Sequence, residues 1–216
     1  MNWKKIFNLT EYRDTEISNK AVQLGFSYSK DDTHYLENQL SQFELLKEGR
    51  HEIRNILRSG YYPEDPIKII FDDRQVINYG KSSASYEQTV FFFQSKELSL
   101  PDFKLKPEEF YHRFFAWLGY EDIDFESHPE FSNKFHLSGE CETVIRNYFN
   151  KQVLDYFASR PSLYLEASNY YFILYQHNHL CPVAYLPTFN AIYSMIAELF
   201  MINSKRQTKI KNKILK

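Results

Sequence analysis

The hydrophobic pattern changes its period several times along this chain of 216 residues, and this change limits the folds open to it. Residues 10–24 show the spacing of an amphipathic helix, with Thr10 as the expected N-cap and Gly25 as the C-terminal stop. Three β-branched and aromatic runs follow, at 67–71, 76–79 and 88–93, with breaks at Asp72-Asp73 and 80–83. Such runs separated by turn residues are typical of an antiparallel meander. The pattern predicts an α+β protein of antiparallel strands and short helices.

The remaining elements follow from the same signals. Helices are expected at 31–40 (capped by Asp32 or Thr33), 50–58, 107–118, 140–149, 151–159 and 187–203. Strands are expected at 26–29, 135–137, 163–166 and 171–175, the last two joined by a turn at Ser168-Asn169. Residues 98–105 alternate around Pro101, which lacks a backbone donor and therefore indicates an edge strand.

In both parts of the chain the expected elements follow a similar order: a strand, two short helices, strands and a helix. This suggests two structurally similar halves, as a hypothesis, although the residues themselves do not repeat. The expected organisation is an N-terminal helical arm (1–24), a first α+β half (25–120), a second α+β half (121–203) and a basic tail (204–216).

Aromatic residues are the unusual part of the composition, since 19 Phe, 17 Tyr and 2 Trp make up 18% of the chain. Large rings fill a core with few side chains, so we expect an aromatic-rich core in preference to an exposed platform for sugars or bases. The charge is uneven. Six Lys and Arg and no acid lie between 204 and 216, so with a net charge of −2 overall the preceding residues carry −8.

Nothing in the sequence indicates export or a membrane span. The longest uncharged apolar stretch, 184–197, is shorter than the roughly 20 residues that cross a bilayer and contains Pro187 and Asn190. The first residues lack the apolar region of a signal peptide, and Cys141 and Cys181 form no disulfide framework. We therefore expect a cytoplasmic protein.

Several stretches resemble a family of uncharacterised bacterial proteins. The specific motifs are LPxFxLxPE, here residues 100–108, and DIDFxxHPEFS, here residues 122–132. The similarity extends from about residue 20 to 200 and includes Gly25-Phe26-Ser27-Tyr28, 69–72 and Gln88-Thr89-Val90. Members often carry transmembrane helices before this region, and we expect none in this chain. The resemblance implies the extent of the domain and no mechanism.

The first candidate site is the polar junction after residue 120. Asp122, Asp124, Glu126, His128 and Glu130 alternate with apolar residues and would share one face of an extended segment. Such a face can bind a hard cation or pair a general acid with a base, as in a metal-dependent hydrolase. Helix caps and a turn at Pro129 are the favoured explanation, because these are the commoner uses of Asp and Pro.

The second candidate is His177, His179 and Cys181, which would offer three zinc ligands if the strand continued. Pro182 follows directly, so the end of a hairpin is the favoured explanation. The six glycines have no phosphate-loop or dinucleotide spacing, and no nucleophile motif is present. We therefore expect no cofactor, no bound metal and no enzymatic activity.

The basic tail is the third candidate. It contains Lys205, Arg206, Lys209, Lys211, Lys213 and Lys216. With Trp3 and Phe7 at the other end, these residues are those of a peripheral membrane contact, although charge runs are usually only solvated. The acidic body disfavours nucleic acid. The leading hypothesis is a cytoplasmic binding or adaptor module with an unknown protein partner, at the inner membrane surface, and the alternative is a metal-dependent hydrolase at 122–130.

Overall fold

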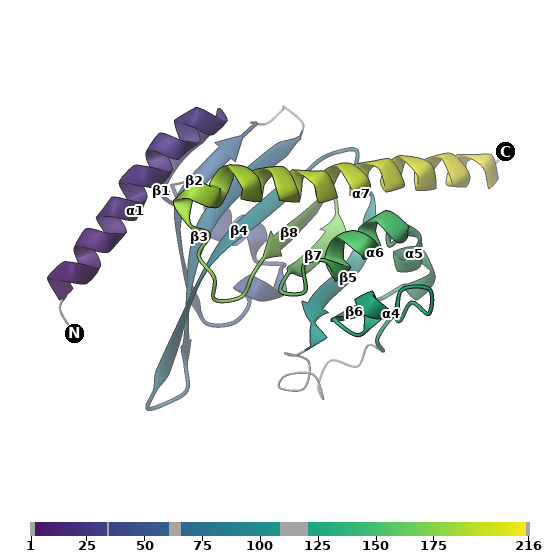
Figure 1. Ribbon diagram of the computed structural model, residues 1–216, viewed down its shortest axis with the longest axis horizontal. Coiled ribbons are helices and arrows are strands. Elements are labelled where there is room, and N and C mark those ends of the chain that lie inside the picture. Colours follow the sequence, from purple (N-terminus) through teal and green to yellow (C-terminus); the bar gives the residue numbers. More distant parts are fainter. Residues whose placement is uncertain (1–2, 34, 61–65, 109–120, 215–216) are drawn as a thin grey trace. The chain divides into compact units, whose positions relative to one another are not determined.

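The computed structural model describes residues 3–33, 35–60, 66–108 and 121–214 (Figure 1). The contacts divide the chain into two compact units, and each is made of two separate pieces. Unit 1 comprises Met1–Phe91 with Asn178–Ile192, and unit 2 comprises Phe92–His177 with Tyr193–Lys216. Both units combine antiparallel strands with helices, which confirms the predicted α+β class. The proposed duplication of the two sequence halves stays a prediction.

Unit 1 contains strands that pair in the order of the sequence, β1-β2-β3-β4. Its elements are α1 (Trp3–Leu24), β1 (Ser27–Asp31), α2 (Leu36–Leu40), η1 (Glu44–Leu46), β2 (Arg50–Ser59), β3 (Ile67–Asn78), most of β4 (Ser83–Gln94), η3 (Val183–Tyr185) and the first residues of α7 (Leu186–Ile214). Helix α1 contacts β1 and β2. These strands and the helix together bury Ile17, Ala21 and Leu57.

Helix α1 ends where the sequence predicts and begins earlier. Gly25 has a φ of 73°, and the Phe26 N–H donates to the Ala21 carbonyl at 2.9 Å, which is a Schellman ending. The prediction that Thr10 caps the helix is wrong, because the helix begins at Trp3. No Gly or Pro lies between residues 3 and 10 to stop it. The helix predicted at 31–40 is shorter than expected, because α2 begins at Leu36 with Tyr35 as its N-cap, although the Asp32 carboxylate accepts from the Leu36 and Glu37 N–H groups.

The predicted helix at 50–58 is wrong, because these residues form strand β2. The pairing of β2 with β3 shifts register between Arg54 and Leu57, and Asn55 there has a φ of 53°. This is a β-bulge, and the extra residue interrupts the alternation of inward and outward side chains. The bulge therefore spaces the buried Ile53, Ile56 and Leu57 by three and four residues, as a helix would.

The predicted turn at Asp72-Asp73 is also wrong, since both residues lie inside the single strand β3. Asp73 is 1% exposed and accepts hydrogen bonds from His51 and Gln88. Asp72 accepts from Arg13, Asn55 and Thr89. A strand tolerates buried carboxylates when each is paired in this way.

Unit 2 has strands in the order β8-β7-β5-β6. Its elements are the end of β4, β5 (Leu100–Pro107), α4 (Pro129–Ser132), β6 (Phe135–Gly139), α5 (Glu142–Tyr148), α6 (Lys151–Ala158), β7 (Tyr164–Asn169), β8 (Tyr171–Tyr175) and the rest of α7. The structure thus confirms the predicted elements near 135, 140–149, 151–159, 163 and 171. The hairpin turn is at Asn169-Tyr170, one residue later than predicted, because Ser168 pairs with Tyr171.

Strand β5 lies between β6 and β7, so the prediction of an edge strand is wrong. Its pairing with β7 is irregular between Leu100 and Phe103, and its pairing with β6 begins only at Phe103. Pro101 therefore lies outside the regular ladder, where its missing donor costs little. The helix predicted at 107–118 lies outside the described residues, apart from Pro107 at the end of β5 and the next residue, Glu108.

Aromatic rings dominate the core of unit 2, as the composition predicts. Phe149 is 1% exposed and its ring lies 5.2 to 6.4 Å, between centroids, from five other phenylalanines. These are Phe103, Phe125, Phe131, Phe157 and Phe200, contributed by β5, the 121–125 segment, α4, α6 and α7. This cluster fixes the segment that carries the candidate site against the strands.

The last helix is longer than the prediction of 187–203. Helix α7 continues to Ile214, so the basic tail is helical as far as this residue (Figure 1). The side chains of residues 210–212 and 214, and all of 215–216, lie outside the description. Within the described residues, no helix combines the length and apolar character needed to cross a bilayer.

Candidate functional site

Three segments of unit 2 bring Glu108, Asp122 and His136 together. Strand β6 pairs with β5 so that His136 lies opposite Lys106 and Phe135 opposite Pro107. The Glu108 N–H donates to the Lys134 carbonyl at 2.8 Å, which extends this pairing by one more bond. On the other side of β6, the Ile123 N–H donates to the Leu137 carbonyl at 2.8 Å. Backbone bonds therefore hold all three residues in place.

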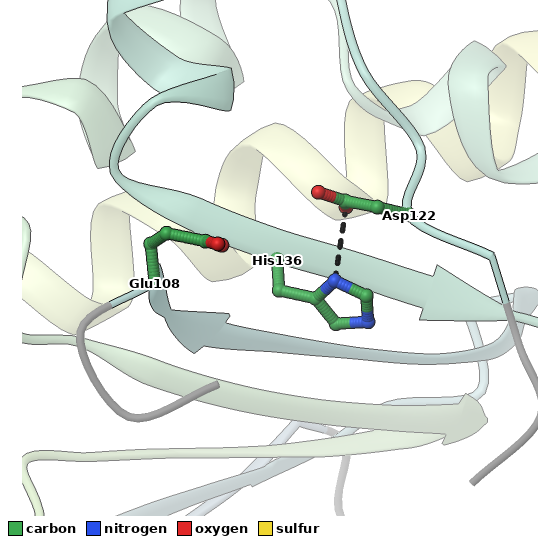
Figure 2. A group of neighbouring side chains, drawn as sticks. All are labelled: Glu108, Asp122 and His136. Carbon is green, nitrogen blue, oxygen red and sulfur yellow. Dashed lines mark ion pairs between the residues drawn. The ribbon is translucent and has the colours of Figure 1, made fainter. Parts of the chain in front are cut away.

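The side chains of this cluster face one another (Figure 2). Oδ1 of Asp122 accepts the Leu137 N–H at 2.8 Å and lies 3.3 Å from Nδ1 of His136. One ligand atom from each of the three residues lies within 4.8 Å of the other two. The His136 side chain is 4% exposed and that of Asp122 is 29% exposed. The cluster is thus buried at His136 and reaches solvent at Asp122.

Glu108 contributes a carboxylate oxygen with unsatisfied hydrogen-bonding capacity. Its Oε2 is shielded from solvent and has no hydrogen-bond partner within the part of the chain that the structure describes. A shielded carboxylate oxygen without a donor or a cation loses solvation without replacement. Two carboxylates and one imidazole are also the ligand types of a divalent transition metal. We call Glu108, Asp122 and His136 the EDH cluster.

The polar junction does not act as one face. After Asp122 and Asp124 the chain turns, because the His128 N–H donates to the Phe125 carbonyl at 2.8 Å. His128 bonds to Ser127, and Glu130 forms an ion pair with Lys134 at 2.6 Å. The carbonyl of Asp124 accepts from Arg146. Only Asp122 among these residues joins the EDH cluster, and it bonds to a strand amide instead of capping a helix.

The strand that would align His177, His179 and Cys181 does not continue. Strand β8 ends at Tyr175, and Asn178 has a φ of 53°, so alternate side chains do not share a face. Cys181 is buried, and its N–H donates to the Thr89 hydroxyl at 2.9 Å. Burial raises the pKa of the Cys181 thiol to about 11, which disfavours the thiolate that zinc requires.

The sequence patterns did not predict a polar network in unit 1. Arg13 on α1 makes two bonds of 2.9 Å to the Asp72 carboxylate and donates to the Cys181 carbonyl. Asn55, at the bulge, donates to Asp72 and accepts from Tyr28. The signal was an Asp pair inside a β-branched run, which is better explained by a buried network than by a turn. These bonds join α1 to the strands and indicate a structural role.

The end of α7 presents a continuous exposed stripe within unit 2. Met195, Ile202, Arg206, Lys209 and Lys213 recur at intervals that place them on one side of the helix, and all are exposed. Met195 and Ile202 are 51% and 49% exposed. The other side of this helix is buried at Ile196, Ala197, Phe200, Asn203 and Ser204. We call the five exposed residues the α7 stripe.

The other tail residues predicted as membrane contacts are not part of the α7 stripe. Lys205 lies off the stripe and pairs with Glu97 at 2.9 Å. Lys211 lies within α7 without a described side chain, and Lys216 lies outside the described residues. The side chains of Trp3 and Phe7 are also outside the description.

The architecture defines an α+β protein built on antiparallel strands with an aromatic core. No protein-family model matches the sequence, and no curated protein matches it. In fold, the chain is similar to the crystal structure of the mycobacterial trehalose monomycolate transport factor A, TtfA, with a TM-score of 0.60. The match covers 88% of this chain and 93% of that one at 11% sequence identity. At this identity the similarity shows a shared fold.

Proposed function

We propose that the chain is a non-enzymatic adaptor module that docks on an anionic membrane surface through the α7 stripe and presents unit 2 to a protein partner. The observation that carries this proposal is that exposed apolar and basic residues lie on the same side of one continuous helix. The cytoplasmic face of the inner membrane is the surface to which such a stripe is complementary.

The stripe has the chemistry of a peripheral contact. Residues 195 to 213 extend over about 27 Å at the rise of an α-helix. Met195 and Ile202 supply apolar area for insertion, and Arg206, Lys209 and Lys213 supply charge. Each cation is worth about 1 kcal/mol near an anionic surface. Glu198, the one acidic residue in the sequence of α7, belongs to the apolar end of the helix.

The fold similarity is consistent with a binding role. TtfA is named as a transport factor, and we infer that this chain likewise assists a process without carrying out a reaction of its own. The alternative, a metal-dependent hydrolase at 122–130, has less support. Asp124, His128 and Glu130 bond to separate partners and do not converge on a substrate.

Sedimentation with liposomes tests the proposal. We expect the full chain to bind vesicles of phosphatidylglycerol and phosphatidylcholine at low salt, and not vesicles of phosphatidylcholine alone. The triple substitution Arg206→Glu, Lys209→Glu and Lys213→Glu should abolish binding. Binding by the parent should weaken steeply as salt rises, because exposed charges are screened within about 8 Å at physiological ionic strength.

A matched control separates the stripe from net charge. Lys47, Arg50 and Lys81 are exposed residues of unit 1 and are not part of α7, so their triple change to Glu alters the net charge equally. This control should retain binding. Replacing Met195 and Ile202 with Ser should weaken binding at high salt more than at low salt, since it removes insertion and leaves the charge. Equal binding by both charge variants, or no binding by the parent, would contradict the proposal.

A further inference from the structure

We propose that the EDH cluster binds one divalent transition-metal ion of the zinc type, with Glu108, Asp122 and His136 as its three protein ligands. This proposal concerns a different part of unit 2 from the α7 stripe and stands independently of membrane docking. It replaces the expectation from the sequence that the chain holds no metal.

The distances fit such an ion. Zinc binds carboxylate oxygen and imidazole nitrogen at about 2.0–2.2 Å, so two ligands at tetrahedral angles lie roughly 3.4 Å apart. The 3.3 Å between Oδ1 of Asp122 and Nδ1 of His136 is already this spacing. One ligand atom of Glu108 lies within 4.8 Å of a ligand atom of each of the other two residues, so it needs to move by at most about 1.4 Å, which the three side-chain torsions of Glu108 allow.

The unsatisfied oxygen of Glu108 is a second observation that points to a cation. Its Oε2 is shielded from solvent and unpaired among the described residues, although the side chain lies beside a carboxylate and an imidazole. Hydrogen bonding between Asp122 and His136 alone would leave this oxygen without compensation. A divalent ion compensates all three groups at once.

The ligand types select the class of metal. Magnesium and calcium prefer oxygen ligands only, whereas an imidazole nitrogen favours zinc and its neighbours. Backbone bonds to Leu137 and Lys134 hold Asp122 and Glu108 near His136, which organises the ligands before the ion arrives. Exposure at Asp122 leaves a route of entry and room for a water molecule as a fourth ligand.

Titration with zinc tests this site directly. The full chain carrying Cys141→Ser, which removes an exposed thiol, is freed of metal by a chelator and titrated with zinc chloride in a calorimeter. We expect one ion per chain. Glu108→Gln and Asp122→Asn should each weaken binding by about tenfold or more, since even changes to groups outside the ligand set cause such losses. Asp122→Asn keeps an oxygen that can accept the Leu137 N–H, so its fold should persist.

Control variants distinguish the cluster from general acidity. Asp124→Asn and Glu130→Gln remove carboxylates of the same segment that lie outside the cluster, and both should bind zinc as the parent does. Circular dichroism confirms that each variant is folded, and if Glu108→Gln is not, Asp122→Asn alone decides. Absence of zinc binding by the parent, or undiminished binding by a folded cluster variant, would overturn the proposal.

Discussion

The hydroxyl of Ser204 on α7 accepts a hydrogen bond of 3.1 Å from the backbone N–H of Ser99, immediately before β5. Ser204 is completely buried, and the neighbouring Asn203 is 3% exposed and donates to the Tyr148 carbonyl at 3.0 Å. The basic tail therefore begins inside the core of unit 2. Residues 204–216 therefore contribute to the fold at their first residue.

Two truncations should separate the core from the exposed stripe. A chain that ends at Lys205 keeps the bond between Ser99 and Ser204, whereas a chain that ends at Asn203 leaves the Ser99 amide unpaired. A buried donor without a partner costs about 1–3 kcal/mol. Urea unfolding should show this loss between the two truncated chains, and Ser204→Ala in the full chain should reproduce it. The exposed substitution Lys209→Ala should leave the midpoint unchanged.

Removing Asp72 should destabilise unit 1 strongly. Its carboxylate, 13% exposed, accepts from Arg13, Asn55 and Thr89, so Asp72→Ala leaves several donors unpaired. Breaking such a pair costs about 3–5 kcal/mol, and the partial exposure of Arg13 favours the lower end. The comparison is Glu130→Ala, whose exposed pair with Lys134 is worth about 0.3–0.5 kcal/mol. Equal melting temperatures of the two variants would show that the Asp72 network contributes little.

The elements that were predicted correctly depend mainly on local signals. The Gly25 ending and the helices α5 and α6 each follow from a few neighbouring residues. The errors arise where distant residues decide the structure. The bulge at Asn55 produces the spacing of a helix, and Asp72 is tolerated in a strand because Arg13, on another element, pairs with it together with Asn55 and Thr89.

The residues of the candidate site show the same difference between local signals and distant partners. Asp122 was identified from the polar junction, but its partners Glu108 and His136 come from separate strands or strand ends. Their proximity depends on the pairing of β5 with β6, which no local pattern specifies. The neighbouring Asp124, His128 and Glu130 do not contribute, because the chain turns after Asp124.

His51 should make the stability of the protein depend on pH. Burial alone lowers the His51 pKa, but the hydrogen bond to Asp73 and its charge outweigh this effect, and the pKa is raised above 6.5. Both ring nitrogens face acceptors, Asp73 at 2.8 Å and the Glu48 carbonyl at 3.0 Å, which suits the protonated ring. A raised pKa in the folded state gives stability that is fully present below pH 6.5 and lost as pH rises through the folded pKa.

Melting temperatures across pH 5.5 to 8.5, a range of about one to two units around the ordinary histidine pKa, test this effect. The difference between the parent and His51→Gln should be largest at the acid end and shrink as pH rises. His177 provides the opposite sign, since burial lowers its pKa and protonation therefore opposes folding. The melting temperature of His177→Gln should therefore rise relative to that of the parent as pH falls. If the difference in melting temperature between the parent and His51→Gln stayed constant with pH, the raised His51 pKa and its ion pair with Asp73 would be contradicted.

The two cysteines should differ in reactivity. Cys141 is exposed, whereas Cys181 is 5% exposed and burial raises its pKa to about 11. Because the thiolate is the reacting species, iodoacetamide at pH 8 should modify only Cys141 in the native protein and both thiols in urea. Mass spectrometry counts the additions, and Cys141→Ser should show none under native conditions. Rapid native labelling of Cys181 would mean that its surroundings open readily.

The two-piece composition of each unit bears on how the chain folds during synthesis. Domains usually fold as they leave the ribosome, beginning with the N-terminal one. Here the first 91 residues lack the 178–192 piece, which carries the Cys181 backbone groups that bond to Arg13 and Thr89. Nearly nine tenths of the polypeptide must therefore be made before unit 1 is complete. Until then Arg13 on α1 and Thr89 on β4 remain without these hydrogen-bond partners.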